Sequence, residues 1–256
     1  MIRAVIRAAF FAVALAGPAL ADESIVTGLS QNRVSITADF VGSEILVYGA
    51  VKRDAPAPEG SPLEVIVTVE GPAAPVTVRR KERVAGIWIN NASIRVDSAP
   101  SFFAIATTGP LNHILSDTEN LRFDITIERV IRAVGITAEA DKAGEFLLAL
   151  LRVRTQEDRY RVLEGKVELT EDTLFRTDVE LPANLIEGEY KVRIFLLRDQ
   201  KVIAHQERLV GVRKVGLERF IFNLAHEQPL IYGLLSLVLA AVAGWVASTA
   251  FRLMRN

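Results

Sequence analysis

Apolar and polar residues alternate with a two-residue period over three segments of the chain, 33–40, 175–181 and 190–196. This period is typical of β-strands that have one buried and one solvated face. The predicted buried face of the second segment consists of Phe175, Thr177, Val179 and Leu181. Segment 45–51 is continuously apolar, so it predicts a strand that is buried on both faces.

Further short strands are separated by turns. They are predicted at 63–70, 76–80, 86–90, 93–96, 102–107 and 201–212, and a turn at Asp199-Gln200 leads into the last one. Short strands with turns at this spacing favour a β-sandwich. Segment 141–154 differs, because its apolar residues recur at the spacing of a helix that packs on a sheet.

The expected fold is mainly β, with one or two immunoglobulin-like β-sandwich units, a helical insertion and a C-terminal transmembrane helix. Two units would cover residues 24–110 and 120–214, with a boundary near Gly109-Pro110. One continuous sandwich that carries the helical insertion is the alternative, and the sequence leaves both open. The immunoglobulin-like pattern is an analogy between folds and carries no functional information.

The N-terminus has the three parts of a signal peptide. Arg3 and Arg7 precede an uncharged, mostly apolar segment, 8–20, and Ala19-Leu20-Ala21 fits the small-x-small cleavage pattern. Residues 1–21 are therefore expected to be a signal peptide that is cleaved after Ala21.

A second apolar segment, 229–251, contains no charged residue. As a helix it would be ~34 Å long, which is enough to cross a hydrocarbon core of ~30 Å. Tyr232 and Trp245 lie near its two ends, where amphipathic rings favour the membrane interface. Segment 217–224, just before it, is expected to be either an interfacial helical turn or an early start of the membrane helix.

Basic residues lie on both sides of this segment, so their distribution does not decide its orientation. They are Arg213, Lys214 and Arg219 before it, and Arg252 and Arg255 after it. The signal peptide decides the orientation, because it directs the following residues across the membrane. Residues 22–228 are thus expected in the periplasm of a bacterium, with one span in the inner membrane and a cytoplasmic tail at 252–256.

Composition narrows the possible functions. The formal net charge is −1 at pH 7, so no strong overall field favours nucleic acid as a partner. The chain has no cysteine, which excludes disulfides, thiolate nucleophiles and cysteine metal sites. The exported part must therefore be stabilised by its apolar core.

The sequence contains no recognisable catalytic constellation. His113, His205 and His226 are not spaced as metal ligands, and neither a nucleophile elbow nor a phosphate-binding glycine loop is present. Acidic residues are plentiful, but a catalytic pair cannot be told from solvated strand faces. The chain is accordingly expected to have no cofactor, no metal and no enzymatic activity.

One cluster is a candidate binding site. Arg79, Arg80, Lys81 and Arg83 lie within five positions of one another and precede Trp88. Such cations repel one another, and a nearby anion or acidic partner would relieve the repulsion. Strand alternation places Arg79 and Lys81 opposite Arg80, so all four cannot share one face. A solvated edge strand is the alternative, and Trp88 is expected in the core.

A second candidate surface lies in the predicted span, where small residues recur every four positions. They are Ser236, Ala240, Gly244 and Ser248. A stripe of small side chains lets another helix approach closely. It is therefore a candidate helix-packing face, although an alanine-rich span produces some such stripe by chance.

The segment from Val78 to Asn90, with Arg79-Arg80-Lys81-Glu82-Arg83 and Trp88, resembles a distinctive motif of an alphaproteobacterial putative transmembrane protein family of unknown function. Weaker matches are Phe175-Arg176, Leu181-Pro182-Ala183, Gly188-x-Tyr190, Leu197-Arg198-Asp199, Tyr232-Gly233-Leu234 and Gly244-Trp245. Gln200 departs from the glycine expected after Arg198-Asp199. The resemblance implies a signal peptide, an extracytoplasmic domain, one C-terminal span and a membrane partner such as a permease resembling sulfite exporters. It implies no activity and no site residues.

Three functional hypotheses follow. The first is a non-enzymatic, membrane-anchored periplasmic protein that binds a membrane partner such as a transporter. The second is an envelope enzyme that acts on glycan or lipid, which requires a concave pocket with convergent acidic or histidine side chains. The third is a structural envelope protein that binds an anionic polymer or headgroup through the basic cluster.

Overall fold

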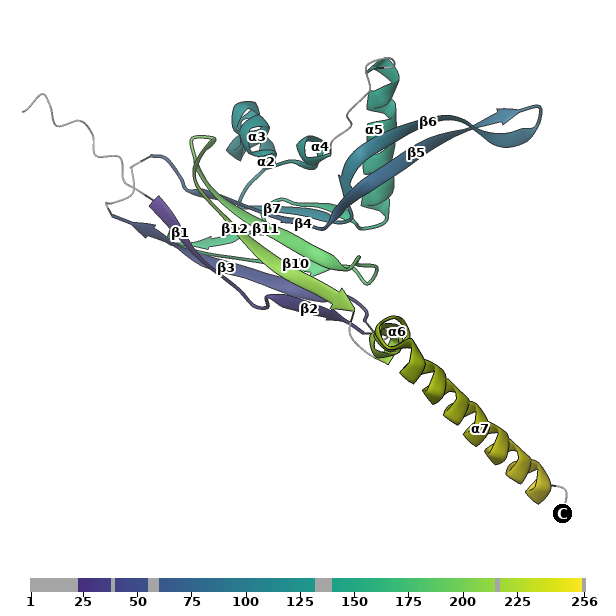
Figure 1. Ribbon diagram of the computed structural model, residues 1–256. Coiled ribbons are helices and arrows are strands. Elements are labelled where there is room, and N and C mark those ends of the chain that lie inside the picture. Colours follow the sequence, from purple (N-terminus) through teal and green to yellow (C-terminus); the bar gives the residue numbers. More distant parts are fainter. Residues whose placement is uncertain (1–22, 38–39, 55–59, 132–139, 215–216, 255–256) are drawn as a thin grey trace, which may run out of the picture.

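The computed structural model describes residues 23–37, 40–54, 60–131, 140–214 and 217–254 (Figure 1). The predicted signal peptide, 1–21, and the last two residues of the predicted cytoplasmic tail, 255 and 256, lie outside the described residues. The described chain forms two packed sheets, a layer of helices, a long hairpin and two C-terminal helices.

The first sheet has four strands in the order β1-β3-β10-β9, and the second has six in the order β2-β12-β11-β4-β7-β8. The first comprises β1 (Glu23–Leu29), β3 (Ser43–Arg53), β10 (Leu174–Leu181) and β9 (Glu168–Thr170). The second comprises β2 (Arg33–Ile36), β12 (Lys201–Lys214), β11 (Gly188–Arg198), β4 (Glu64–Glu70), β7 (Phe103–Thr107) and β8 (Tyr160–Leu163). Pairing is antiparallel except for β12 with β2 and β7 with β8.

Strands from the two predicted units pair with each other. β3 lies beside β10 in the first sheet, and β4 lies beside β11 in the second. Segments 24–110 and 120–214 therefore build one two-sheet sandwich and are not spatially separate units.

The sandwich interior follows the alternation of the sequence. Phe175, Thr177, Val179 and Leu181 of β10 are buried, and the residues between them are exposed, as predicted. Tyr190, Val192, Ile194 and Leu196 of β11 face them from the second sheet. The Tyr190 hydroxyl donates a hydrogen bond to the Ile186 carbonyl (3.0 Å), which satisfies the one polar group of this buried ring.

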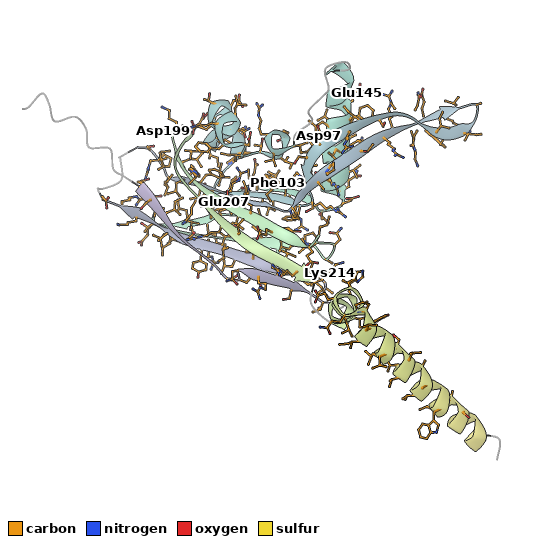
Figure 2. All side chains as sticks on the ribbon, viewed as in Figure 1. Asp97, Phe103, Glu145, Asp199, Glu207 and Lys214 are labelled. Carbon is orange, nitrogen blue, oxygen red and sulfur yellow. The ribbon has the colours of Figure 1, made fainter. Side chains whose placement is uncertain are left out.

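Four helices cover the outer face of the six-stranded sheet (Figure 1). They are α2 (Leu111–Ile114), α3 (Asp117–Phe123), α4 (Ile127–Val130) and α5 (Ala140–Gln156), and α5 confirms the helix predicted at 141–154. Phe103, labelled in Figure 2, lies in the resulting second core with Ile66, Ile105 and Phe195 of the sheet. The described chain is thus mainly β with a helical insertion.

The position of the helical layer shows that the burial predicted for segment 45–51 is wrong. The segment 45–51 was expected to be buried on both faces, but in β3 only Ile45, Val47 and Val51 are buried. The outer face of the four-stranded sheet is open, so Tyr48 points to solvent. The doubly buried strands are β4 and β7, because they lie between the first sheet and the helices.

Strands β5 (Ala73–Val84) and β6 (Ile87–Pro100) form a two-stranded hairpin that projects from the helical layer (Figure 1). They unite the predicted short strands 76–80, 86–90 and 93–96. The hairpin turns at Ala85 and Gly86, whose φ values of 50° and 87° suit a tight turn between twisted strands. Its base packs on α5, whereas its far half leaves the domain.

The C-terminal apolar segment forms α7 (Pro229–Met254), and residues 229–248 of it have a mean hydropathy of 2.2. Its composition and length suit a membrane span, as predicted. It is preceded by a separate helix, α6 (Leu217–Glu227). In Figure 1, α7 and the hairpin leave the sheets at the same end of the molecule.

Candidate functional site

The predicted basic cluster lies on the projecting half of the hairpin, which we call the hairpin arm (residues 79–93 of β5 and β6). Every residue from 79 to 91 is exposed. Trp88 is 65% exposed and Ile87 is 68% exposed, so the prediction that Trp88 lies in the core is wrong. The arm extends beyond the layer that would cover it, and the apolar tip is left in solvent.

The pairing of β5 with β6 gives the arm two chemically different faces. Directly opposed residues of an antiparallel pair share a face. On one face Arg79 lies opposite Ser93, Lys81 opposite Asn90, and Arg83 opposite Trp88. On the other face Arg80 lies opposite Ala92, Glu82 opposite Ile89, and Val84 opposite Ile87. The first face is cationic with one indole ring, and the second becomes apolar toward the tip.

The structure separates Arg80 from the other cations, as the alternation predicts. The Arg80 guanidinium lies 3.5 Å from a Glu145 carboxylate oxygen and 5.9 Å from the centre of the Phe146 ring. Both residues belong to α5, and Figure 2 shows Glu145 beside the hairpin. Arg80 therefore fastens the arm to the domain. Arg79, Lys81 and Arg83 form the cationic face.

Few negative charges of the protein itself neutralise the positive charges of this cationic face. Within the described part of the chain, none of Arg79, Lys81 and Arg83 forms an ion pair with a carboxylate. Arg83 donates a hydrogen bond from Nε to the Gly86 carbonyl (3.4 Å) at the turn. The one carboxylate of the arm, Glu82, lies on the other face and accepts a hydrogen bond from the Asn91 amide. The face can accept an anion without first breaking an ion pair of its own.

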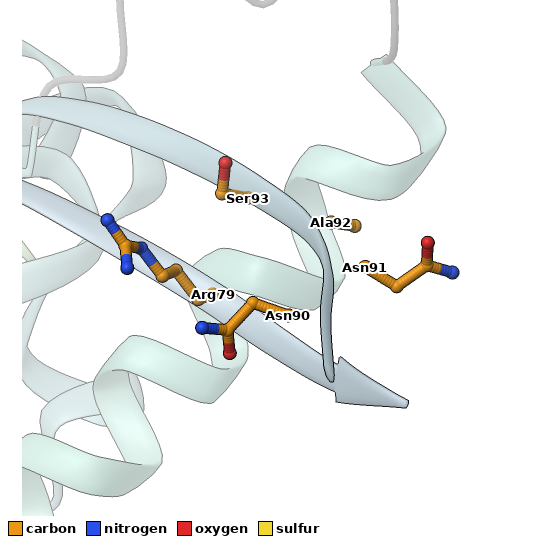
Figure 3. Close-up of a pocket in the computed structure, with 5 residues that line it drawn as sticks. All are labelled: Arg79, Asn90, Asn91, Ala92 and Ser93. Atoms are coloured by element: carbon orange, nitrogen blue, oxygen red, sulfur yellow. The ribbon is translucent and has the colours of Figure 1, made fainter. Parts of the chain in front are cut away.

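A shallow hollow marks the middle of the arm (Figure 3). The pairing of β5 with β6 shifts between Arg80 and Lys81, so Asn91 is an extra residue on β6. Such a bulge bends and twists the strand locally. The hollow is lined by Arg79, Asn90, Asn91, Ala92 and Ser93, and Figure 3 shows Arg79 and Asn90 beside one another, with the guanidinium of Arg79 pointing away from Asn90. A guanidinium beside amide and hydroxyl groups suits an acidic or carbonyl oxygen.

The histidines are placed separately. The His205 ring lies 5.2 Å from that of Phe123, between β12 and the helical layer. His226 lies in α6, where its Nδ1 is 2.9 Å from the Phe222 carbonyl oxygen, and His113 lies in the last turn of α2. Among the described residues, no three His, Asp or Glu side chains lie close enough together to hold a metal ion.

The small residues Ser236, Ala240, Gly244 and Ser248 lie along α7 and are exposed. The Ser236 hydroxyl donates to the Tyr232 carbonyl (2.9 Å), so it is satisfied within its own helix. Of the described elements, α7 contacts α6 at the junction of the two helices. The stripe is sterically open to a second helix.

The sequence located the cluster but missed the apolar tip. Val84, Ile87 and Ile89 join Trp88 as exposed large apolar side chains, and none of the three was predicted as a site residue. The sequence feature that could have indicated this tip is Ala85-Gly86, because a turn at these residues brings Val84 and Ile87 together.

Comparison with known protein families gives a match over most of the chain. The family model described as Putative transmembrane protein (Alph_Pro_TM) matches residues 24–253. No curated protein matches the chain. The crystal structure of Spo0M, a sporulation control protein from Bacillus subtilis, aligns at 10% identity with a TM-score of 0.28, over 80% of this chain and 55% of that one. The chain thus spans about half of that protein, and the likeness is too low to carry an argument.

Proposed function

Because the chain belongs to this alphaproteobacterial family of transmembrane proteins, we propose that it is a membrane-anchored periplasmic binding protein without catalytic activity. Its hairpin arm engages another protein of the same membrane. A transporter, such as a permease resembling sulfite exporters, is the class of partner that the resemblance to the family favours.

The exposed arm is the observation that carries the proposal. Ile87 and Trp88 are each about two-thirds exposed at its tip, and the arm supplies no side chain to the sandwich interior. An exposed apolar group flanked by charges is typical of an interaction site. Tryptophan and arginine are also the residue types that dominate binding energy at protein interfaces. The expected partner surface is an apolar pocket with an acidic rim.

The position of the arm supports a partner in the same membrane. A cleaved signal peptide would place the sandwich in the periplasm, with α7 in the inner membrane. The arm leaves the sheets at the end from which α7 departs (Figure 1). It therefore extends over the neighbouring membrane surface, where the periplasmic loops of an integral protein lie.

Site-specific photo-crosslinking in native membranes tests this proposal. A photoreactive phenylalanine at Ile87 is compared with the same group at Leu148 on α5, because both side chains are 68% exposed. We expect Ile87 to give reproducible adducts with one membrane protein and Leu148 to give none. Equal adducts at both positions, or no adduct at Ile87, would contradict the proposal.

The two faces of the arm provide a second test. Replacing Arg79, Lys81 and Arg83 with alanine should abolish the Ile87 adducts, and raising the salt concentration should weaken them in the wild type. Arg80→Ala is the matched control, because Arg80 contacts α5. It should retain adduct formation. If Arg80→Ala and the triple variant behave alike, the cationic face is not the recognition surface.

An anionic lipid or polymer could instead bind the same cations. The fluorescence of Trp88 shows whether the arm contacts lipid. In a Trp245→Phe chain, Trp88 is the single tryptophan. The purified protein is placed in vesicles of phosphatidylethanolamine and phosphatidylglycerol, without a protein partner. If the arm binds a protein and not lipid, aqueous iodide should quench the fluorescence of Trp88. Quenching of Trp88 by brominated lipid would instead assign the arm to the bilayer surface.

A further inference from the structure

The chain bends between α6 and α7 at a single position. The Gln228 amide donates to the Leu224 carbonyl and so ends α6, whereas the Gln228 carbonyl accepts from the amides of Ile231 and Tyr232 and so begins α7 (3.1 Å each). Pro229 has no amide hydrogen and disfavours a helical conformation at the residue before it. In Figure 1, α6 is seen along its axis while α7 is seen from the side, so the two helices cross at a large angle.

The sequence of α6 is amphipathic. Helical spacing groups Leu217, Phe220, Ile221 and Leu224 along one side. Arg219, Asn223 and His226 follow the opposite side, together with Phe222, whose ring stacks on that of His226 with 4.1 Å between the ring centres. By contrast α7 is apolar on all sides, as a lipid-exposed span must be. The two helices thus have the compositions of an interfacial helix and of a transmembrane helix.

Among the described side chains on the apolar side of α6, Ile221 is left exposed by the domain. Ile221, on the apolar side, is 41% exposed, and α6 contacts α7 at the junction of the two helices. The 26 residues of α7 already span ~39 Å, which exceeds the ~30 Å hydrocarbon core, so α6 is not needed to cross the membrane. A helix joined by a sharp bend to the outer end of a span lies at the level where the headgroups begin.

We propose that α6 lies flat in the outer headgroup layer of the membrane that α7 crosses. Its apolar side contacts the acyl chains, and its polar side faces the water. The occupant of this surface is the lipid bilayer itself, because α6 is continuous with the membrane span. An in-plane helix beside an upright one resists rocking of the domain, and it keeps the last strand, β12, at a fixed height above the membrane. Figure 2 places Lys214, at the end of β12, beside this junction.

Spin-label scanning of the full-length chain in vesicles of phosphatidylethanolamine and phosphatidylglycerol tests this arrangement. The chain has no cysteine, so one introduced cysteine carries the only label. Single cysteines are placed from 217 to 227, and Ile221→Cys and Asn223→Cys are the central pair. Accessibility to oxygen, which concentrates in lipid, is compared with accessibility to a nickel chelate, which stays in water.

An in-plane α6 predicts a helical period of 3.6 residues in these accessibilities. Oxygen should dominate at 221 and 224, and the nickel chelate should dominate at 219 and 223. Nickel accessibility at every position would place α6 upright in water and overturn the proposal. Oxygen accessibility at every position would make α6 the start of the span. Protection of 221 from both reagents would show that it packs on protein. Each result is independent of the hairpin arm and its partner.

Discussion

Glu23 is a buried carboxylate in the first strand of the sandwich. Its side chain is 3% exposed and accepts hydrogen bonds from Arg53 Nε (2.9 Å) and from Arg198 Nη2 and Nε (3.0 and 3.2 Å). Burial alone would raise the pKa of Glu23, but the bonds from Arg198 and Arg53 outweigh it and lower the pKa below its ordinary value of 4.5. Residues 175 positions apart are thus held together by one carboxylate.

Glu23→Gln is expected to destabilise the fold by about 3–5 kcal/mol, because it leaves the buried Arg198 without a counter-charge. Unfolding of the full chain in detergent, followed by circular dichroism, measures this loss. The control is Glu168→Gln, which removes an exposed ion pair with Arg176 and should leave the midpoint unchanged. Equal effects of the two variants would show that the Glu23 cluster contributes no more than a surface pair.

The pH dependence follows from the direction of the shift. A carboxyl whose pKa is lowered on folding stabilises the native state above its unfolded-state value, and that stabilisation is lost as the pH falls. The wild type should therefore lose stability below about pH 4.5, and the difference from Glu23→Gln should shrink there. A difference that stays constant from pH 7 to pH 3 would argue against the assigned pKa shift.

Gln200 has a left-handed backbone conformation, which glycine adopts more easily than glutamine. The predicted turn forms at Asp199 and Gln200 with φ values of 49° and 63°. Gln200→Gly removes the strain of a left-handed residue but gains entropy in the unfolded chain, so a net stabilisation of up to ~1 kcal/mol is expected. Lys201→Gly, in the following strand, should destabilise instead. Thermal unfolding of both variants distinguishes the two effects, and a lower midpoint for Gln200→Gly would contradict it.

At the level of elements, local periodicity predicted most strands correctly because side-chain alternation is a property of the strand itself. The positions of β10, β11 and α5 are examples. Burial depends on what covers each face, which the local sequence does not encode. Segment 45–51 was therefore expected to be doubly buried, although the doubly buried strands are β4 and β7.

The same reason limited prediction of the candidate site. The charges of residues 79–83 and their alternation were readable, and the separation of Arg80 from its neighbours is confirmed. Trp88 was misplaced, because an indole ring beside apolar residues is usually core, and only the three-dimensional length of the hairpin leaves it exposed. The sequence left open whether 24–110 and 120–214 form two units or one continuous sandwich for a related reason, since the antiparallel pairing that joins these distant segments is not visible in local patterns.

The arm should be removable without unfolding the domain. Replacing residues 81–91 by Asn-Gly joins Arg80 to Ala92, which already face each other, through a favoured two-residue turn. The change removes only exposed side chains. The unfolding midpoint is therefore expected to stay nearly constant, and circular dichroism measures it. A control deletion that also removes Val96 and Val76 should lower the midpoint, because they pack in the second core. A large loss from the first deletion would mean that the arm stabilises the fold.

At the scale of the whole molecule, the orientation of α7 in the membrane decides which compartment contains each of the proposed surfaces. In the proposed arrangement, the hairpin arm and an in-plane α6 act in the same compartment, and α7 separates that compartment from the predicted cytoplasmic tail, 252–256. Basic residues flank the span on both sides and leave its direction undecided. The predicted signal peptide is thus the single determinant, and a test of orientation is also a test of that peptide.

Single cysteines again make the test specific, because the chain has none. Asn90→Cys, on the exposed arm, should react with a membrane-impermeant maleimide in intact spheroplasts, and Asn256→Cys should react only after permeabilisation. Mass spectrometry of the purified chain should find Asp22 as its first residue. Replacing Arg3 and Arg7 with glutamate should prevent export and abolish labelling at Asn90, because a signal peptide requires its positive end. The reverse labelling pattern would place the sandwich in the cytoplasm, and the arm could then meet only the cytoplasmic face of a partner.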